Sequence, residues 1–341
     1  MLWVLSQVTL LVTLWVYSKR GVAFMRESAG GRIATGMLLG MLGLAIVWLV
    51  QLPFGLAAHW WNRRHDLSDA GYLDWALENW SVLGAEFLFI CLALLIVMAI
   101  AGPLGDRWWV PGAAVFIGLG ALFGFISPYL TYDTKPLRDQ ELRAAARDYE
   151  HDQGLDRVPL RVEEVSSFTK QANAYADGFG PTKEVVLWDT LLGGEYSDGE
   201  VKVVLAHELG HHSSDHIPKG IAWYALFALP GTYLLMRATR RRGGMGQPEA
   251  VPLSLFVLAA LTLAAAPVEN WISRRMEAEA DWKALQSTRD PASDSSLMVE
   301  FARSSLGDPN PPTWAYALLS THPTFEQRVA MANAWAARRG R

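Results

Sequence analysis

The stretch VVLAHELGHHSSDH, residues 203–216, places two histidines four residues apart within an apolar run. Residues at that spacing project from one face of a helix, so the imidazoles of His207 and His211 can bind one Zn²⁺ ion. Glu208 follows the first histidine and can act as general base on a water molecule that the ion activates. Gly210 lacks a side chain, which we expect to let a substrate backbone approach. The stretch therefore predicts a helix with a catalytic zinc site.

A His-Glu-x-x-His pattern also occurs by chance, and catalytic zinc needs a third protein ligand and an open fourth position. The segment NWISRRMEAEADWKAL, residues 270–285, offers candidates. Glu277 and Asp281 are four residues apart and share a helical face, whereas Glu279 points elsewhere. We predict that Glu277 is the third ligand and that Asp281 orients a ligand histidine. The alternative is that Glu277 lies on a solvated helix face beside two arginines.

The rest of the chain is depleted in charge. Of its 341 residues, 51% are hydrophobic and 19% are charged, against about 25% charged in an average soluble domain. Six stretches are almost free of charge, at about 2–17, 33–58, 82–101, 109–131, 219–236 and 252–267. Four of them clearly reach the roughly 17–25 residues that span a bilayer, and the first and last are shorter. Because the runs are apolar on all faces, buried helices of a soluble protein are disfavoured. We predict a multi-pass protein of the cell membrane.

Charge and cysteine content exclude little else. The net charge of -4 gives no indication of a nucleic-acid partner. The single cysteine, Cys91, lies in a predicted span, so no internal disulfide can form. Basic residues flank the spans in similar numbers on both sides, nine opposite the zinc site and seven beside it. The positive-inside rule therefore favours an extracytoplasmic site, but by a margin too small to decide which side of the membrane holds it.

The polar segments indicate a small folded unit between membrane helices. Residues 136–154 read as an exposed helix that stops at Gly154, and residues 158–165 and 184–189 as short strands, with a turn between them. We expect four parts: a membrane region with about four spans (1–132), a zinc domain (133–217), a transmembrane hairpin (218–270) and a C-terminal segment that completes the site (271–341). The predicted fold is mainly α, a helical membrane bundle with a small α+β metallopeptidase domain.

Several motifs in order carry a family resemblance. They are RRHDLSDAGYLDW, PLRDQELRAAA, SSFTKQANAYADGFGPTKEVVLWDTLL, HELGHHSSDH, NWISRRMEAEAD and PPTWAYALLSTHPTFEQRVAMA. Together they make the chain resemble the type I CAAX prenyl endopeptidases, which are integral-membrane zinc metallopeptidases with a zincin-like domain. The bacterial heat-shock membrane protease is a more distant relative. The chain departs from the eukaryotic members because it has one fewer N-terminal span and lacks an acidic insertion before the zinc helix, which puts prenyl specificity in doubt.

The resemblance implies further site residues. It makes Glu277 the third zinc ligand, with Asp281 closing the same motif. It implies that His322, followed by Pro323, and Arg328 stabilise the oxyanion of the tetrahedral intermediate. It also implies that Asn173 and Ala174 bind substrate, since an exposed strand edge can pair with an extended peptide. The alternatives are a turn-capping Asn173 and a helix-starting His-Pro pair. The resemblance further implies a cytoplasmic active site.

Two functions remain in view. The first is a zinc metalloendopeptidase whose partners are the lipid bilayer and a peptide or protein substrate. That substrate is either a prenylated CAAX-type C-terminus or a membrane protein in quality control. The second is a non-catalytic scaffold or transporter that holds a structural zinc ion. A transport path is expected to carry ionisable residues, and within the confident spans Glu86 is the one carboxylate that we find.

Overall fold

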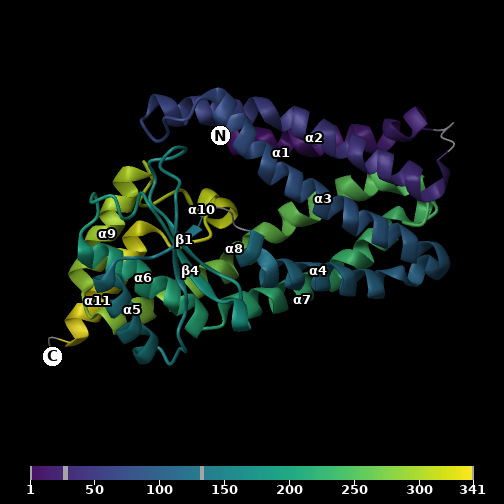
Figure 1. Ribbon diagram of the computed structural model, residues 1–341. Helices are drawn as coiled ribbons and strands as arrows, with labels where there is room; N and C mark the ends of the chain where they lie inside the picture. The colour runs from purple at the N-terminus through teal and green to yellow at the C-terminus, as the bar shows by residue number, and fades with distance from the viewer. Residues whose placement is uncertain (1, 26–29, 131–133, 340–341) are drawn as a thin grey trace. The chain divides into compact units, whose positions relative to one another are not determined.

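The computed structural model describes residues 2–25, 30–130 and 134–339 (Figure 1). The chain forms two compact units whose segments alternate along the sequence. The first comprises Met1–Arg64, Gly71–Ala121 and Ile221–Ala265, and the second His65–Ala70, Leu122–Gly220 and Ala266–Arg341, apart from the residues outside the described ranges. The predicted boundary between residues 132 and 133 and the side chain of Glu86 also lie outside what the structure describes.

Long helices account for all six apolar runs as far as the structure describes them. They are α1 (Leu2–Arg20), α2 (Gly31–Arg64), α3 (Tyr72–Leu104), α4 (Trp109–Leu130), α7 (His216–Thr239) and α8 (Val251–Thr288). Short 3-10 turns adjoin them at η1 (Gly21–Met25), η2 (Gly105–Trp108), η4 (Arg240–Arg242) and η5 (Pro248–Ala250). Among the described residues, four helical stretches are long and apolar enough to cross a membrane: Leu2–Ala23, Gly31–Arg64, Phe87–Leu130 and Pro248–Thr288. The chain is a multi-pass membrane protein, as predicted.

The helices of the first unit pack closely through small residues. Helices α1 and α2 lie side by side (Figure 1). Gly36 and Gly40 of α2 face Met98 and Leu94 of α3, and a β-carbon at either glycine would lie about as near as 2.3 or 2.4 Å to those side chains. Small residues four apart allow this close approach of membrane helices. A stable apolar bundle follows.

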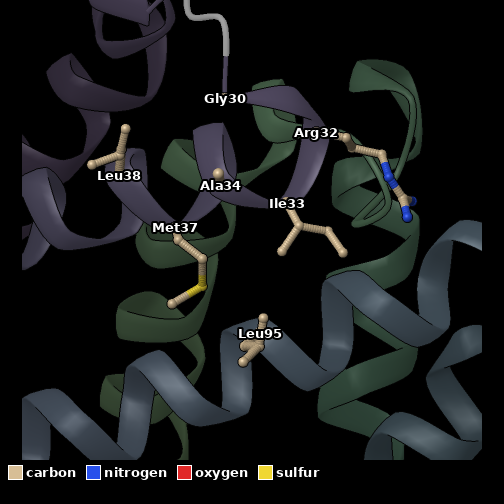
Figure 2. Close-up of a pocket in the computed structure, with 7 residues that line it drawn as sticks. All are labelled: Gly30, Arg32, Ile33, Ala34, Met37, Leu38 and Leu95. Atoms are coloured by element: carbon tan, nitrogen blue, oxygen red, sulfur yellow. The ribbon is translucent and has the colours of Figure 1, made fainter.

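Helices α2 and α3 also border a shallow groove of about 830 Å³, which Figure 2 shows in close-up. Its lining is apolar except for Arg32, whose guanidinium donates to the carbonyl of Gly246 at 3.0 Å. The groove offers no carboxylate, imidazole or thiol, so the candidate chemistry has to lie elsewhere.

The second unit contains a four-stranded sheet in the order β1-β2-β4-β3. The strands are β1 (Thr134–Pro136), β2 (Leu160–Glu163), β3 (Ala174–Asp177) and β4 (Glu184–Trp188). Strand β4 pairs parallel with β2 and antiparallel with β3. Both predicted strands are confirmed as β2 and β4. The short extended piece before the turn at η3 (Gly180–Thr182) is β3, which forms an edge of the sheet.

The second unit also contains the helices α5 (Gln140–Asp152), α6 (Asp198–Ser213), α9 (Pro291–Ser304), α10 (Thr313–Leu319) and α11 (Phe325–Arg339), of which α6 contacts β3 and β4. Gly154 follows α5 with φ +67°, which confirms the predicted stop. Helix α6 begins with a capping box between Ser197 and Glu200. Its residues Leu205 and Leu209 are fully buried in the core formed with the sheet. This packing fixes the orientation of α6 and therefore of its histidines.

Candidate metal centre

Helix α6 brings His207 and His211 together as the four-residue spacing predicts. Their Nε2 atoms lie 3.1 Å apart. Both His207 and Glu208 are buried, each about 8% exposed. Helix α6 packs on β3 and β4 of the sheet and against α9, and α8 approaches it closely at Ala280. The two imidazoles and the carboxylate therefore lie in a partly enclosed site.

Helix α8 supplies a carboxylate to the same point. Glu277 Oε2 lies 3.3 Å from His207 Nε2, and Glu277 Oε1 lies 3.6 Å from His211 Nε2. One ligand atom from each of these three residues lies within 4.8 Å of the others. The structure thus joins segments that are distant in the sequence, and Glu277 is buried and not on a solvated face.

Gly210 makes room for a neighbouring helix and not, as expected, for a substrate. A β-carbon at this position would lie 3.2 Å from the backbone of Ala280 on α8, so the missing side chain makes room for a helix and not for a substrate. The expectation that Gly210 opens the site to substrate is therefore wrong. The two small residues allow α6 and α8 to cross closely enough for Glu277 to reach the histidines.

The spacing of the three ligand atoms fits a small tetrahedral ion. A metal bound about 2.0–2.1 Å from each ligand, as zinc is, separates the ligand atoms by roughly 3.3 Å. The two histidine Nε2 atoms lie 3.1 Å apart, Glu277 Oε2 lies 3.3 Å from that of His207, and Glu277 Oε1 lies 3.6 Å from that of His211, so each measured separation is close to that value. The Nε2 atoms of His207 and His322 lie 3.3 and 3.1 Å from the buried Oε2 of Glu277, but among the described residues no hydrogen bond of regular geometry reaches this oxygen. A buried carboxylate oxygen without such a partner is costly, and a cation would satisfy it.

Asp281 supports the first histidine from its other side. Asp281 Oδ1 lies 2.8 Å from His207 Nδ1, as expected of a residue that orients a ligand. Arg328 of α11 donates to both oxygens of Asp281, through Nε at 2.9 Å and Nη2 at 2.5 Å. This bidentate pair is almost fully buried and fixes the carboxylate.

The second histidine has a partner that the sequence analysis missed. His216 Nδ1 lies 2.9 Å from His211 Nδ1, and His216 Nε2 lies 3.3 Å from Oε2 of Glu279. On an unbroken helix a residue five positions after His211 would lie roughly 140° around the axis. The chain instead breaks at Asp215, whose φ is +52°, and α7 begins at His216. A helix break is the signal that could have revealed this residue.

The surrounding charges and burial shift the pKa values of the two imidazoles in opposite directions. Burial disfavours a charged His207, but the carboxylates of Asp281 and Glu277 outweigh burial and raise the pKa of His207 to about 10. Burial and the neighbouring His207 charge lower the pKa of His211 to about 3. Burial also raises the pKa of the Glu208 carboxyl. The carboxylates of Glu277 and Asp281 thus stabilise a positive charge at His207, as they would a bound cation, beside a carboxyl that readily accepts a proton.

A cleft of about 350 Å³ opens onto these residues. Its lining includes Asn173 to Ala176 of the sheet edge, His207, Glu208 and His211 of α6, Glu277 of α8, His322, Arg328, and Leu297 and Phe301 of α9. His322 is 55% exposed at its side chain, and its Nε2 lies 3.1 Å from Glu277 Oε2. Helix α11 begins later, at Phe325, so His322 lies in the loop before it. The two apolar α9 residues were not predicted, because nothing in their local pattern relates them to the zinc helix.

The free edge of β3 faces this cleft. The carbonyl of Asn173 accepts from the amide of Trp188 on β4, so in the alternation of an antiparallel ladder the main-chain groups of Ala174 and Ala176 point away from the sheet. The Ala176 amide acts on the Glu208 carboxyl and favours its charged form. The outer edge of β3 therefore runs next to the candidate general base.

Comparison with known proteins identifies the family. The model of peptidase family M48 matches residues 136–336, which is more than half of the chain. The chain belongs to peptidase family M48. The resemblance drawn from the motifs is confirmed, and the protein is a membrane metallopeptidase.

Individual relatives extend the similarity beyond that region. The chain is 25% identical over 298 residues to the uncharacterized metalloprotease YhfN of Bacillus subtilis, covering 83% of this chain and 70% of that one. It is 26% identical over 341 residues to a CAAX prenyl protease 1 homolog of Oryza sativa, covering 93% and 78%. The crystal structure of S. mikatae Ste24p shares the fold, with a TM-score of 0.78 at 20% identity over 90% of this chain and 78% of that one.

Proposed function

We propose that this M48 metallopeptidase is a zinc-dependent endopeptidase in which His207, His211 and Glu277 bind one Zn²⁺ ion. One observation carries the proposal: two imidazole nitrogens and one carboxylate, from α6 and α8, converge within 4.8 Å of one another beside an open cleft. Two histidines, one glutamate and a free fourth position are typical of catalytic zinc. A bound ion would polarise the scissile carbonyl and lower the pKa of a water molecule, so that its deprotonated, nucleophilic form is available at neutral pH.

Glu208 is the proposed general base. It takes a proton from the attacking water at its carboxylate and returns that proton to the leaving amide nitrogen. Burial raises the pKa of this carboxyl, which makes the carboxylate a better proton acceptor. Its position on α6 directly after His207 holds the carboxylate at the cleft.

The edge of β3 is the proposed substrate platform. An extended peptide can pair with the outward-facing main-chain groups of Ala174 and the outward-facing carbonyl of Ala176, with Asn173 at the start of the strand. Such pairing would draw the scissile bond alongside Glu208. His322 faces the cleft as the oxyanion donor. Arg328 lines the same cleft. It also donates two hydrogen bonds to Asp281 and so fixes the carboxylate that orients His207.

Substrate class is the finer part of the proposal. Relatives named CAAX prenyl protease 1 and Protease HtpX match this chain, and four helical stretches of the described chain can cross a membrane. These similarities favour substrates at the membrane, either a prenylated C-terminus or a membrane protein in quality control. Cleavage of a farnesylated peptide compared with its unlipidated twin separates the two. Equal rates would favour quality control.

Replacement of Glu208 by Gln tests the catalytic proposal. The purified variant should keep its zinc, measured by elemental analysis, and lose peptide cleavage by roughly 100-fold or more. Glu164→Gln, an exposed residue paired with Lys135, serves as the matched control and should cleave at the wild-type rate. Wild-type turnover in the Glu208 variant contradicts the mechanism. Bound zinc without proteolysis in the wild type favours the scaffold alternative.

A further inference from the structure

The two histidines of the proposed metal site are supported in different ways. His207 contacts a carboxylate directly, since Asp281 Oδ1 lies 2.8 Å from its Nδ1. His211 contacts a second imidazole, and that imidazole contacts the Glu279 carboxylate. His216 is 4% exposed, so its ring nitrogens have no ready access to water and depend on these two partners. A chain of imidazole, imidazole and carboxylate therefore lies behind His211.

The chemistry of these three side chains allows hydrogen bonds in one direction only, with His211 donating to His216 and His216 donating to Glu279. An ionised carboxylate only accepts hydrogen bonds, and Lys219 Nζ, 3.7 Å from the same Oε2 of Glu279, stabilises its charge. His216 therefore carries its proton on Nε2 and presents a lone pair at Nδ1. His211 then carries its proton on Nδ1, directed at that lone pair. The Nε2 lone pair of His211 is left facing His207 and Glu277.

The same direction follows from the other end. A histidine that binds a metal through Nε2 has no proton on that nitrogen and donates from Nδ1. Nδ1 of His211 can donate to Nδ1 of His216 only if the latter is unprotonated, which again sends the His216 proton to Glu279. The proposed metal at one end of this hydrogen-bond series and the Glu279 carboxylate at the other therefore require the same tautomers of His211 and His216. Both ring nitrogens of His216 are occupied by these contacts, so His216 is not itself a ligand.

We propose that His216 and Glu279 are positioning residues, which hold His211 in the orientation and tautomer that bind the metal ion. The inference rests on the proposed metal site and adds two residues to it. The break at Asp215 is what makes the arrangement possible, because it turns the first residue of α7 back toward the last turn of α6. Asp215 is itself held near Lys183, at 3.7 Å.

Metal affinity of the purified full-length protein tests the proposal. Zn²⁺ dissociation constants would be measured by competition with a chelator, and the absorption spectrum of the Co²⁺-loaded protein would report ligand geometry. His216→Leu keeps the bulk but removes the acceptor, and should weaken zinc binding by about 10–100-fold and alter the Co²⁺ spectrum. His216→Gln, whose amide oxygen can accept from His211, should restore most of the affinity.

Glu279 offers a second variant that does not threaten the fold, because its side chain is 47% exposed. Glu279→Ala should weaken zinc binding, whereas Glu279→Gln, which keeps an acceptor oxygen, should be milder. His212→Gln is the matched control. His212 is also buried at the end of α6, but its Nε2 contacts the carbonyl of Glu184 at 2.8 Å and not a ligand. That variant should lower thermal stability and leave zinc affinity unchanged.

Wild-type zinc affinity in folded His216→Leu would overturn the inference, and so would equal losses in the Leu and Gln variants, because packing alone would then explain them. These outcomes leave the proposed function standing, since the wild type still binds zinc. A wild-type protein that binds no zinc would instead overturn both.

Discussion

Gly210 and Ala280 lie in contact where α6 crosses α8, with only 3.2 Å between the backbone of Ala280 and the position that a β-carbon on Gly210 would take. The crossing places Glu277 and Asp281 on the two sides of the His207 ring, because they lie one turn apart on α8 around residue 280. The metal site thus depends on how closely two helix backbones approach each other.

Replacement of Gly210 by Ala is therefore expected to move α8 by a few tenths of an ångström and to displace Glu277 from the histidines. Alanine favours a helix by roughly 1 kcal/mol over glycine, which offsets the cost of moving α8, so the stability of the fold should change little. Turnover should fall by about 10-fold, because small misplacements at a reacting centre are costly. Kinetics and zinc affinity would be measured beside Gly220→Ala, where a β-carbon meets nothing within 4 Å. Equal activity of the two variants would contradict this account.

The Asp281–Arg328 pair predicts a non-additive double substitution. Arg328→Met leaves a buried carboxylate without its cation and should destabilise the fold by about 3–5 kcal/mol. Asp281→Asn should weaken zinc binding by about 10–100-fold, since His207 loses its charged partner. The double variant should lose less stability than the two single variants lose together. Thermal unfolding of all four proteins, analysed as a double-mutant cycle, measures the difference. Additive losses would mean that the two side chains act independently.

His322 should affect catalysis more than metal binding. It faces the cleft, is half exposed, and reaches Glu277 without being one of the three ligands. His322→Ala is expected to lower kcat by about 10²–10³-fold, as loss of an oxyanion donor does, while zinc content stays at the wild-type level. His151→Ala is the control, because that side chain is 91% exposed on α5. Loss of zinc from the His322 variant would instead indicate a ligand.

The buried carboxyl of Asp294 should make the stability of the folded protein depend on pH. Burial and the nearby Asp281 charge raise the pKa of Asp294 to about 7. An unfolded Asp ionises near pH 4, so between about pH 4 and 7 the unfolded chain releases a proton that the folded chain retains. Stability therefore falls as pH rises through this window. Asp294→Asn removes the effect.

The melting temperature of the wild type should accordingly fall relative to that of Asp294→Asn by roughly 5–10 °C between pH 4 and pH 7. Thermal unfolding of both proteins across this range measures the difference. The difference between the two profiles isolates Asp294 from the other groups that titrate near it. Parallel profiles would show that Asp294 ionises in the folded protein as it does in the unfolded chain.

Local sequence patterns predict much of this protein. Helical periodicity alone places His207 beside His211, and Glu277 one turn from Asp281, because side chains four residues apart share a face whatever the rest of the fold does. The length and uniform apolarity of the six runs predict membrane helices for a similarly local reason. The strands β2 and β4 and the stop at Gly154 also follow from nearby residues.

Contacts between distant segments come from packing, which these patterns do not contain. The backbone break at Asp215, with φ +52°, turns His216 back onto His211, where helical periodicity would have directed it away. The fork of Arg328 on Asp281 and the approach of Leu297 to the cleft likewise join residues that no local period relates. The sequence by itself determined which side chains each helix offers on one face. The tertiary structure decided which faces meet, because that depends on close packing of backbones such as those at Gly210 and Ala280.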